Sequence, residues 1–218
     1  MTSIDLLIFD LDGTLVNTLE DIASSVDHTL ARLGKAPIGL DAVQRYIGDG
    51  IETLLIRALG GEPADLSAAV SIYKEHHRKN LVVRSQLYPG VLETLEYFKS
   101  IQMAVISNKS TEFISPLLDR LGIARYFTTV IGADAGLLLK PAPDSILRAM
   151  TVSGASKERT VMVGDGTTDI RAGKAAGVIT CAVTYGYRPE EELLQAGPDH
   201  VIHSITELTI LFSLGRNT

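Results

Sequence analysis

The sequence predicts an α/β protein in which a parallel, Rossmann-like sheet is flanked by helices, with a helical cap subdomain inserted after the first strand. Two observations favour this fold class. From residue 88 onward, short apolar runs alternate with amphipathic helical patterns, which is typical of βαβ units. A stretch with helical spacing alone separates the first apolar run from this alternating region.

The first strand is predicted at Ile4–Phe9, an apolar run that only Asp5 interrupts. Such a run is typical of a parallel strand that is buried on both faces. The next residues carry apolar side chains at helical spacing, and glycines end the first three of these patterns. We therefore predict two domains, an α/β core of residues 1–16 and 85–218 and a helical cap of residues 17–84. The cap helices are expected at about 19–33, 40–47, 51–59 and 64–83.

The alternating region must return to the sheet that the first strand begins, because right-handed βαβ crossovers keep parallel strands in one sheet. Strands are expected at 103–106, 128–131, 160–163, 178–183 and 201–202. Helices are expected at 91–98, 113–121, 144–152 and 170–176, followed by a C-terminal helix. The insertion would then lie as a lid over the carboxyl ends of the strands.

Composition excludes several classes of protein. The 218 residues are 45% hydrophobic and 21% charged, which is typical of a globular domain. The net charge is -6 and the chain has no basic tract, so we expect no nucleic-acid partner. No apolar run approaches the roughly 18 residues that a membrane span needs, and no signal peptide is evident. With Cys181 as its single cysteine, the chain is expected in the cytoplasm.

Two carboxylates stand where the first strand ends. Asp10 and Asp12 follow Phe9 directly, and Gly13 and Thr14 begin a loop. Ligands of parallel sheets bind at the carboxyl ends of strands. Paired carboxylates there can hold Mg2+, or one can act as a nucleophile while the other moves protons. The alternative is a loop capped by aspartates with a glycine turn.

Three further loops place polar groups at the ends of predicted strands. Ser107 and Asn108 could bind phosphate oxygens, or they could cap a helix. Lys140 could offset the charge of phosphate and carboxylates, or it could be a solvated surface lysine. Asp165 and Asp169 flank a predicted helix start and could reach one metal site, with a glycine turn and an Asp cap as the alternative.

Together and in this order, the four loops resemble those of the haloacid dehalogenase superfamily of phosphotransferases. The specific motifs are D-L-D-G-T-L at 10–15 and G-D-G-T-T-D at 164–169. The resemblance implies that Asp10 is the nucleophile and that Asp12 is the general acid/base, whose backbone carbonyl also binds Mg2+. Lys140 would steady the nucleophile and the phosphate charge. The remaining roles implied are metal binding by Asp10, Asp12 and Asp165, an auxiliary acid at Asp169, and substrate binding by Thr14, Ser107 and Asn108.

The predicted cap carries a second, finer resemblance. Arg45-Tyr46-Ile47-Gly48-Asp49-Gly50 and the helix after it are similar to the phosphoglycolate phosphatase group. The turn could bring backbone N–H groups and Arg45 near a small acidic substrate, or it could be a plain turn between helices. The cap residues expected to bind substrate are Arg45, Gly48, Asp49 and Gly50.

The resemblance implies a Mg2+-dependent phosphatase that hydrolyses a small phosphomonoester, with 2-phosphoglycolate the best single candidate, through an aspartyl-phosphate. Asp12 favours phosphoryl transfer, since relatives that cleave carbon–halogen bonds lack the second acid. A sugar phosphomutase, a pyrophosphatase, a nucleotidase and a non-catalytic phosphate-binding module remain alternatives. The expected partner is a small phosphorylated metabolite, and the chain is expected to be a monomer or a homodimer. Asn17 and Gly166 depart from the residues that many relatives have, which concerns the hinge and the metal surroundings.

Overall fold

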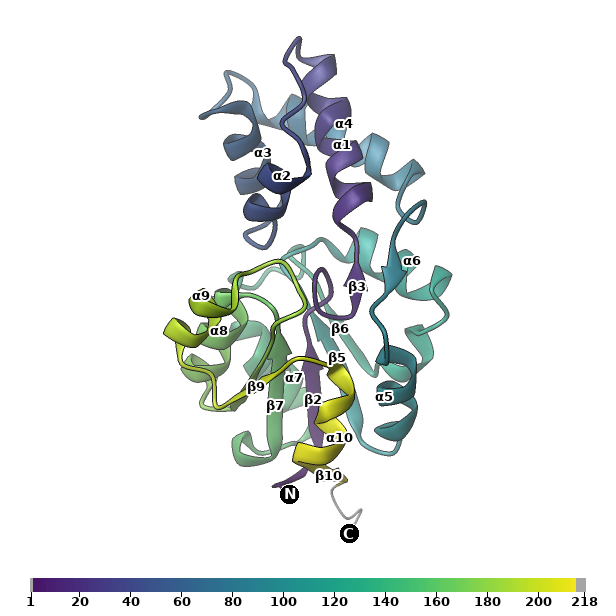
Figure 1. Ribbon diagram of the computed structural model, residues 1–218, viewed down its shortest axis with the longest axis vertical. Helices are drawn as coiled ribbons and strands as arrows, with labels where there is room; N and C mark the ends of the chain where they lie inside the picture. Colours follow the sequence, from purple (N-terminus) through teal and green to yellow (C-terminus); the bar gives the residue numbers. More distant parts are fainter. Residues whose placement is uncertain (1, 215–218) are drawn as a thin grey trace.

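The computed structural model describes residues 2–214, and its centre is a parallel sheet (Figure 1). Within the described residues, this sheet has six strands in the order β6-β5-β2-β7-β8-β9, and every neighbouring pair is parallel. The predicted parallel sheet is thus confirmed. The strands are β2 (Leu6–Phe9), β5 (Gln102–Ile106), β6 (Thr129–Ile131), β7 (Thr160–Gly164), β8 (Ile179–Val183) and β9 (His200–Ile202).

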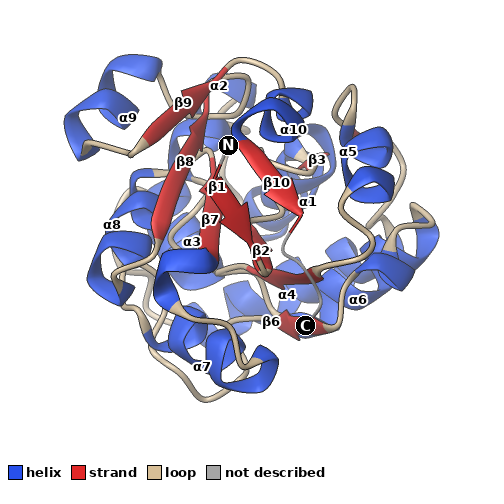
Figure 2. Ribbon diagram, turned by 90° about the horizontal axis from the view of Figure 1, so that it is seen from below, coloured by secondary structure: helices blue, strands red, loops and turns tan. Residues whose placement is uncertain are grey.

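Helices cover both faces of the sheet, as the view along it shows (Figure 2). Alternate residues of the central strand β2 point to opposite faces, as the strand period requires. Leu7 and Phe9 pack in one cluster with residues of α5, α6 and α10, whereas Leu6 and Ile8 pack in another with residues of α7 and α8. The helices are α5 (Val91–Tyr97), α6 (Thr111–Arg120), α7 (Asp144–Ser153), α8 (Thr167–Ala176), α9 (Glu190–Ala196) and α10 (Leu208–Leu211), with 3₁₀ turns η1 (Ala124–Tyr126), η2 (Lys157–Arg159) and η3 (Ile205–Glu207).

The predicted first strand is divided at Asp5. Its first residue, Ile4, belongs to a separate strand, β1 (Thr2–Ile4), which lies outside the main sheet and pairs in parallel with β10 (Phe212–Leu214). Asp5 donates its backbone N–H to the carbonyl of Arg159, and its Oδ1 lies 2.7 Å from Nη2 of the same arginine. A single uninterrupted strand from Ile4 to Phe9 was therefore a wrong prediction, because Ile4 pairs with Leu214 of β10 and the strand of the main sheet begins only at Leu6.

The predicted helical insertion contains α1 (Leu19–Arg32), α2 (Leu40–Tyr46), α3 (Ile51–Leu59) and α4 (Leu66–Lys79). We call these helices the α1–α4 unit. Their apolar faces pack on one another in a cluster of their own, which includes Val26, Leu30 and Leu55. The unit lies beyond the carboxyl ends of the strands (Figure 1). None of the helices within residues 2–214 has the length and apolar character to cross a membrane.

Two chain crossings join the α1–α4 unit to the rest. They pair as the antiparallel strands β3 (Val16–Asn17) and β4 (Gln86–Leu87). Asp21 of α1 fixes the returning chain, since its carboxylate accepts hydrogen bonds from three successive backbone N–H groups of residues 83–85 and from the hydroxyl of Ser85, 2.6 Å away. The first turn of α1 and the return strand are thereby held together.

Candidate active site

The register of the sheet brings the predicted site loops to one place. Phe9 of β2 is paired with Val105 of β5 on one side and with Val163 of β7 on the other. The residues that follow these three positions therefore leave the sheet at the same level. Asp10, Ser107 and Asp165 come from these strand ends, so the convergence expected from the sequence is present.

Lys140 is the centre of this group. Its Nζ lies 2.9 Å from Oδ1 of Asp10, 2.5 Å from Oδ1 of Asp169 and 2.9 Å from the carbonyl oxygen of Ile106. Its residue surface is only 4% exposed, so it is not the solvated lysine of the alternative interpretation. Burial alone would lower the pKa of Lys140, but Asp10 and Asp169 raise it above its ordinary value. The ammonium group therefore keeps its charge.

Three carboxylates crowd around this single ammonium. Oxygen atoms of Asp10, Asp165 and Asp169 all lie within 4.8 Å of one another. Burial raises the pKa of Asp10 to about 6; Lys140 opposes this rise and Asp169 adds to it. Burial, followed by the charges of Asp10 and Asp169, raises the pKa of Asp165 to about 7. Both pKa values are raised mainly because burial disfavours an ionised carboxylate, and the neighbouring carboxylates add to the rise.

This donor set fits the cation that the family resemblance implies. Carboxylate oxygens are the hard ligands that Mg2+ prefers. Oδ1 of Asp10 is buried and, although it lies beside Lys140, forms no aligned hydrogen bond with any of residues 2–214. It therefore has a lone pair free for a metal ion or for a reacting phosphorus atom. The third carboxylate in the cluster with Asp10 and Asp165 is that of Asp169. The carboxylate of Asp12 is directed away from this cluster.

Asp165 is held rigidly by its neighbours. Its Oδ1 accepts a hydrogen bond from the hydroxyl of Thr14 at 2.9 Å, and its Oδ2 accepts one from the backbone N–H of Tyr187 at 2.8 Å. Gly13 has φ +89°, and a Cβ atom there would lie 2.2 Å from Oδ2 of Asp165. The glycine of the D-x-D-G motif is thus required by the close approach of a carboxylate. The hydroxyl of Thr14 is engaged with Asp165, and its predicted contact with substrate stays a prediction.

The carboxylate of Asp12 has a separate environment. Its Oδ1 accepts a hydrogen bond from the hydroxyl of Thr18 at 2.6 Å and lies 3.1 Å from Nζ of Lys109. Thr18 stands at the start of α1, so Asp12 links the end of β2 to the α1–α4 unit. The hydroxyl of Tyr187 accepts a hydrogen bond from the backbone N–H of Thr18 at 2.7 Å, which extends the link to the loop after β8.

The loop after β5 contacts both parts of the protein. The side-chain amide of Asn108 donates to the carbonyl oxygens of Gly48 and Lys140, each at 2.9 Å, and its Oδ1 accepts from the backbone N–H of Lys140. The amide is therefore fully engaged as a bridge. Ser107 is 6% exposed, and its Oγ accepts a weak hydrogen bond from the backbone N–H of Lys109. Its hydroxyl proton is available to a ligand.

The cap residues that are predicted to bind substrate border two different openings at the site. Gly48 and Gly50 line a small cavity that also contains Asp10 and Asp12. Arg45 is exposed and borders a wider opening on the side of Asp165. Asp49 borders the same opening, and its carboxylate lies 2.6 Å from Nη1 of Arg57. Substrate binding by these cap residues stays a prediction.

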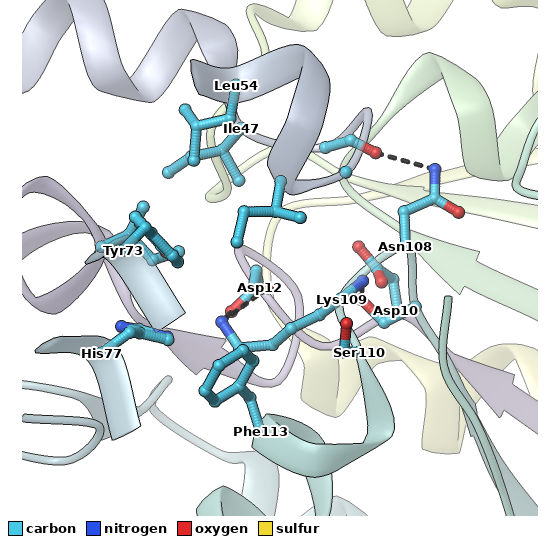
Figure 3. Close-up of a pocket in the computed structure, with 15 residues that line it drawn as sticks. Asp10, Asp12, Ile47, Leu54, Tyr73, His77, Asn108, Lys109, Ser110 and Phe113 are labelled. Atoms are coloured by element: carbon cyan, nitrogen blue, oxygen red, sulfur yellow. Dashed lines mark hydrogen bonds and ion pairs between the residues drawn. The ribbon is translucent and has the colours of Figure 1, made fainter. Parts of the chain in front are cut away.

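The small cavity lies between the strand ends and the α1–α4 unit (Figure 3). Its volume is about 60 Å³. Ile47 and Leu54 form one wall and Tyr73 and His77 another, while the side chain of Lys109 runs along Phe113 to reach Asp12. The wider opening on the other side of Asp10 has a volume of about 420 Å³.

Two departures from the family pattern have a structural counterpart. Gly166 donates its backbone N–H to Oδ2 of Asp169 at 2.9 Å, an interaction that needs no side chain. Oδ1 of Asn17 lies 3.3 Å from the backbone N of Leu19 and 3.4 Å from the hydroxyl of Tyr187. Among residues 2–214, neither of these two residues forms a hydrogen bond with Asp10.

Two residues of the site were not assigned from the sequence. The predictions from the sequence give no role to Lys109 or to Tyr187. A lysine directly after the predicted phosphate-binding Ser107 and Asn108 is a signal that the sequence does contain. For Tyr187 no local signal exists, because its partner Thr18 lies 169 residues away.

The sequence matches the haloacid dehalogenase-like hydrolase family over residues 7–183. The chain belongs to this family. A phosphoglycolate phosphatase of Pseudomonas aeruginosa is 37% identical over 212 residues, covering 93% of this chain and 78% of the relative. One from Agrobacterium fabrum is 36% identical, covering 94% of this chain and 90% of the relative.

A crystal structure of a predicted phosphoglycolate phosphatase from Haemophilus somnus has a similar fold. It superposes with a TM-score of 0.91 at 30% identity and covers 97% of this chain and 99% of its own. The resemblance to haloacid dehalogenase-like hydrolases, and within them to the phosphoglycolate phosphatase group, is therefore confirmed. The four loops that carried it are the loops that meet around Lys140.

Proposed function

We propose that this protein is a Mg2+-dependent phosphatase that hydrolyses a small phosphomonoester, with 2-phosphoglycolate as the substrate, through a phosphorylated Asp10. The observation that carries the proposal is the meeting of Asp10, Asp165 and Asp169 around Lys140. The relatives named phosphoglycolate phosphatase support the choice of substrate. The cytoplasm is the proposed location.

The chemistry follows from the two environments of the acids. Asp10 would attack phosphorus with a carboxylate oxygen, and the leaving alcohol oxygen would take a proton from Asp12. A water molecule, losing its proton to Asp12, would then hydrolyse the acyl phosphate and release Asp10. Lys140 would stabilise negative charge on the phosphoryl oxygens, and Ser107 would donate a hydrogen bond to one of them.

Asp10, the backbone carbonyl of Asp12 and Asp165 would hold Mg2+, with Asp169 as an auxiliary acid at the same cluster. When bound, Mg2+ would offset charge on the transferred phosphoryl group and orient its oxygens. Asp169 fixes Lys140 by their ion pair, and Thr14 fixes Asp165, so both would act by positioning.

The α1–α4 unit would act as a cap, with the core formed by residues 1–16 and 85–218 and the cap by residues 17–84. Gly48 and Gly50 would close over the substrate, and Arg45 and Asp49 would border the entrance. A closed cap excludes bulk water, so that only the nucleophilic water reaches the acyl phosphate.

The deciding experiment measures phosphate release from a panel of phosphomonoesters with and without Mg2+. The panel contains 2-phosphoglycolate, a hexose phosphate, a nucleotide and pyrophosphate. We expect 2-phosphoglycolate to be the preferred substrate, and we expect chelation of Mg2+ to abolish its hydrolysis. A preference for another compound in the panel would show that 2-phosphoglycolate is not the substrate. Conversion of a hexose phosphate without net release of phosphate would indicate a mutase.

The nucleophile is tested separately. With substrate labelled in its phosphoryl group, acid quenching of wild-type protein should leave label on Asp10, and Asp10→Asn should carry none. The same substitution is expected to lower kcat by about a thousandfold or more, since it removes the nucleophile. Retained activity in purified Asp10→Asn protein would contradict the mechanism.

A further inference from the structure

Lys109 is a buried cation for which the reaction described above has no use. Its Nζ lies 3.1 Å from Oδ1 and 3.3 Å from Oδ2 of Asp12. The side chains of this pair are 8% and 11% exposed. A buried ion pair is rarely more stabilising than apolar side chains of the same volume, because both charges lose their hydration. Stability alone therefore does not explain why a lysine stands here.

The surroundings of Lys109 isolate its charge. It projects into the small cavity along the apolar side chain of Phe113 (Figure 3). Among the described residues that line this cavity, it is the only lysine or arginine. His77 lines the same cavity, but burial and then the charge of Lys109 lower its pKa far below the usual value, so its ring stays neutral. Nε2 of His77 is buried and has no hydrogen-bond partner within the part of the chain that the structure describes.

We propose that Lys109 binds the carboxylate group of the substrate, so that it selects phosphate esters of small 2-hydroxy acids over neutral phosphomonoesters. This inference rests on the proposed phosphatase function and assigns its substrate class to one residue. An ammonium group has three N–H donors, and Asp12 occupies at most two of them. At least one donor remains for a second acceptor.

The position of Asp12 indicates which group of the substrate would be this second acceptor. In an ester of a 2-hydroxy acid, the carboxylate is attached to the carbon that carries the ester oxygen. If Asp12 protonates that oxygen, the substrate carboxylate must lie close to Asp12 as well. Once Asp12 has given up its proton, two carboxylates lie at that separation and repel each other unless a cation lies between them. Lys109 is already in contact with Asp12 and supplies that cation.

The size of the cavity limits the acid. A volume of about 60 Å³ has room for about four to six water-sized groups. A carboxymethyl group fits that volume, whereas a hexose or a nucleoside would have to extend into the wider opening, which Lys109 does not line. Ile47, Ile51 and Leu54 also line this cavity, and their side chains offer no hydrogen bonds to sugar hydroxyls. Charge and size together favour a two-carbon acid.

The test compares two esters that differ in this group, 2-phosphoglycolate and 2-hydroxyethyl phosphate. The readout is the ratio of their kcat/KM values in wild-type protein, Lys109→Met and Lys109→Arg. Losing a charge-assisted hydrogen bond in a dry site should lower this ratio about 10- to 100-fold in Lys109→Met, mainly through KM. Lys109→Arg keeps the charge and should recover part of the ratio. The matched control is Lys79→Met, which removes a lysine of an exposed ion pair on α4 and should not change the ratio.

Lys109→Gln provides a second neutral variant if Lys109→Met does not fold. If the kcat/KM values of both esters fell by the same factor, the assignment would be overturned, because Lys109 would then act only through Asp12. A wild-type protein that hydrolyses both esters equally well would refute 2-phosphoglycolate as the substrate, and no variant is needed for that result. A wild-type preference for 2-phosphoglycolate that survives unchanged in both neutral variants would overturn the role of Lys109 and leave the phosphatase proposal intact.

Discussion

Asp10→Asn should stabilise the metal-free protein, although it removes the proposed nucleophile. The pKa of Asp10 is raised from 3.8 to about 6, mainly by burial. A carboxyl group whose pKa is higher in the folded state favours folding while it is protonated, and this contribution is lost as pH rises from about 4 to about 6. At about 1.4 kcal/mol per pKa unit, the ionised carboxylate costs the folded state about 3 kcal/mol at pH 8. Asparagine has the same shape and cannot ionise.

The assay is urea unfolding in the presence of a chelator at pH 5 and pH 8. Wild-type protein should be less stable at pH 8, and Asp10→Asn should be about 1 to 3 kcal/mol more stable than wild type at that pH. Excess Mg2+ should restore the stability of wild-type protein at pH 8, because it binds the folded state. Excess Mg2+ should stabilise Asp10→Asn less than it stabilises wild-type protein, because the variant lacks one of the proposed metal ligands.

The control is Asp119→Asn, which neutralises an exposed aspartate on α6 and should change stability by no more than about 0.5 kcal/mol. If metal-free Asp10→Asn were less stable than wild type at pH 8, the carboxylates would not be in electrostatic conflict. The same conclusion would follow if the stability of wild-type protein were independent of pH between 5 and 8. Either result would remove the electrostatic argument for a cation at this site.

Three other substitutions have defined expected outcomes. Lys140→Met should lower kcat by about 10²- to 10³-fold and shift the acidic limb of the pH–rate profile to higher pH, because losing the ammonium raises the pKa of Asp10 further. Asp21→Asn should lower the free energy of unfolding in urea by about 2 to 4 kcal/mol, since its carboxylate accepts several buried hydrogen bonds. Gly13→Ala should weaken Mg2+ binding in calorimetry by about tenfold or more, because its Cβ would displace Asp165.

The sequence predicts the main sheet because each strand is a short apolar run between helices of recognisable period. The structure confirms this, and the register of Phe9 with Val105 and Val163 explains why loops distant in the sequence meet. Pairings that depend on distant residues were not predictable. Ile4 pairs with Leu214 of β10, near the other end of the described residues, and not with a strand of the main sheet. Strands β3 and β4 have only two residues each, too few to show a period.

The candidate site likewise has features that the sequence predicts and features that it does not predict. Asp10, Asp165 and Lys140 follow strands or stand in loops with specific motifs, so their convergence could be expected from the fold class. The pairing of Lys109 with Asp12 could not be expected, because it depends on the direction of side chains within the loops. Sequence spacing places a residue at a strand end, but it does not say which of several nearby acids a lysine contacts.

The two lysines divide the acids of the site into two groups with different surroundings. Lys140 lies among Asp10 and Asp169, where one ammonium faces an excess of carboxylates. Lys109 is paired with Asp12 alone among the acids, beside apolar side chains. Neighbouring acids perform different tasks when their environments differ, and here the group suited to a cation and a phosphoryl group is separate from the group beside the leaving alcohol. A carboxylate on that alcohol would meet the second lysine, so substrate choice and proton transfer would depend on the same ion pair.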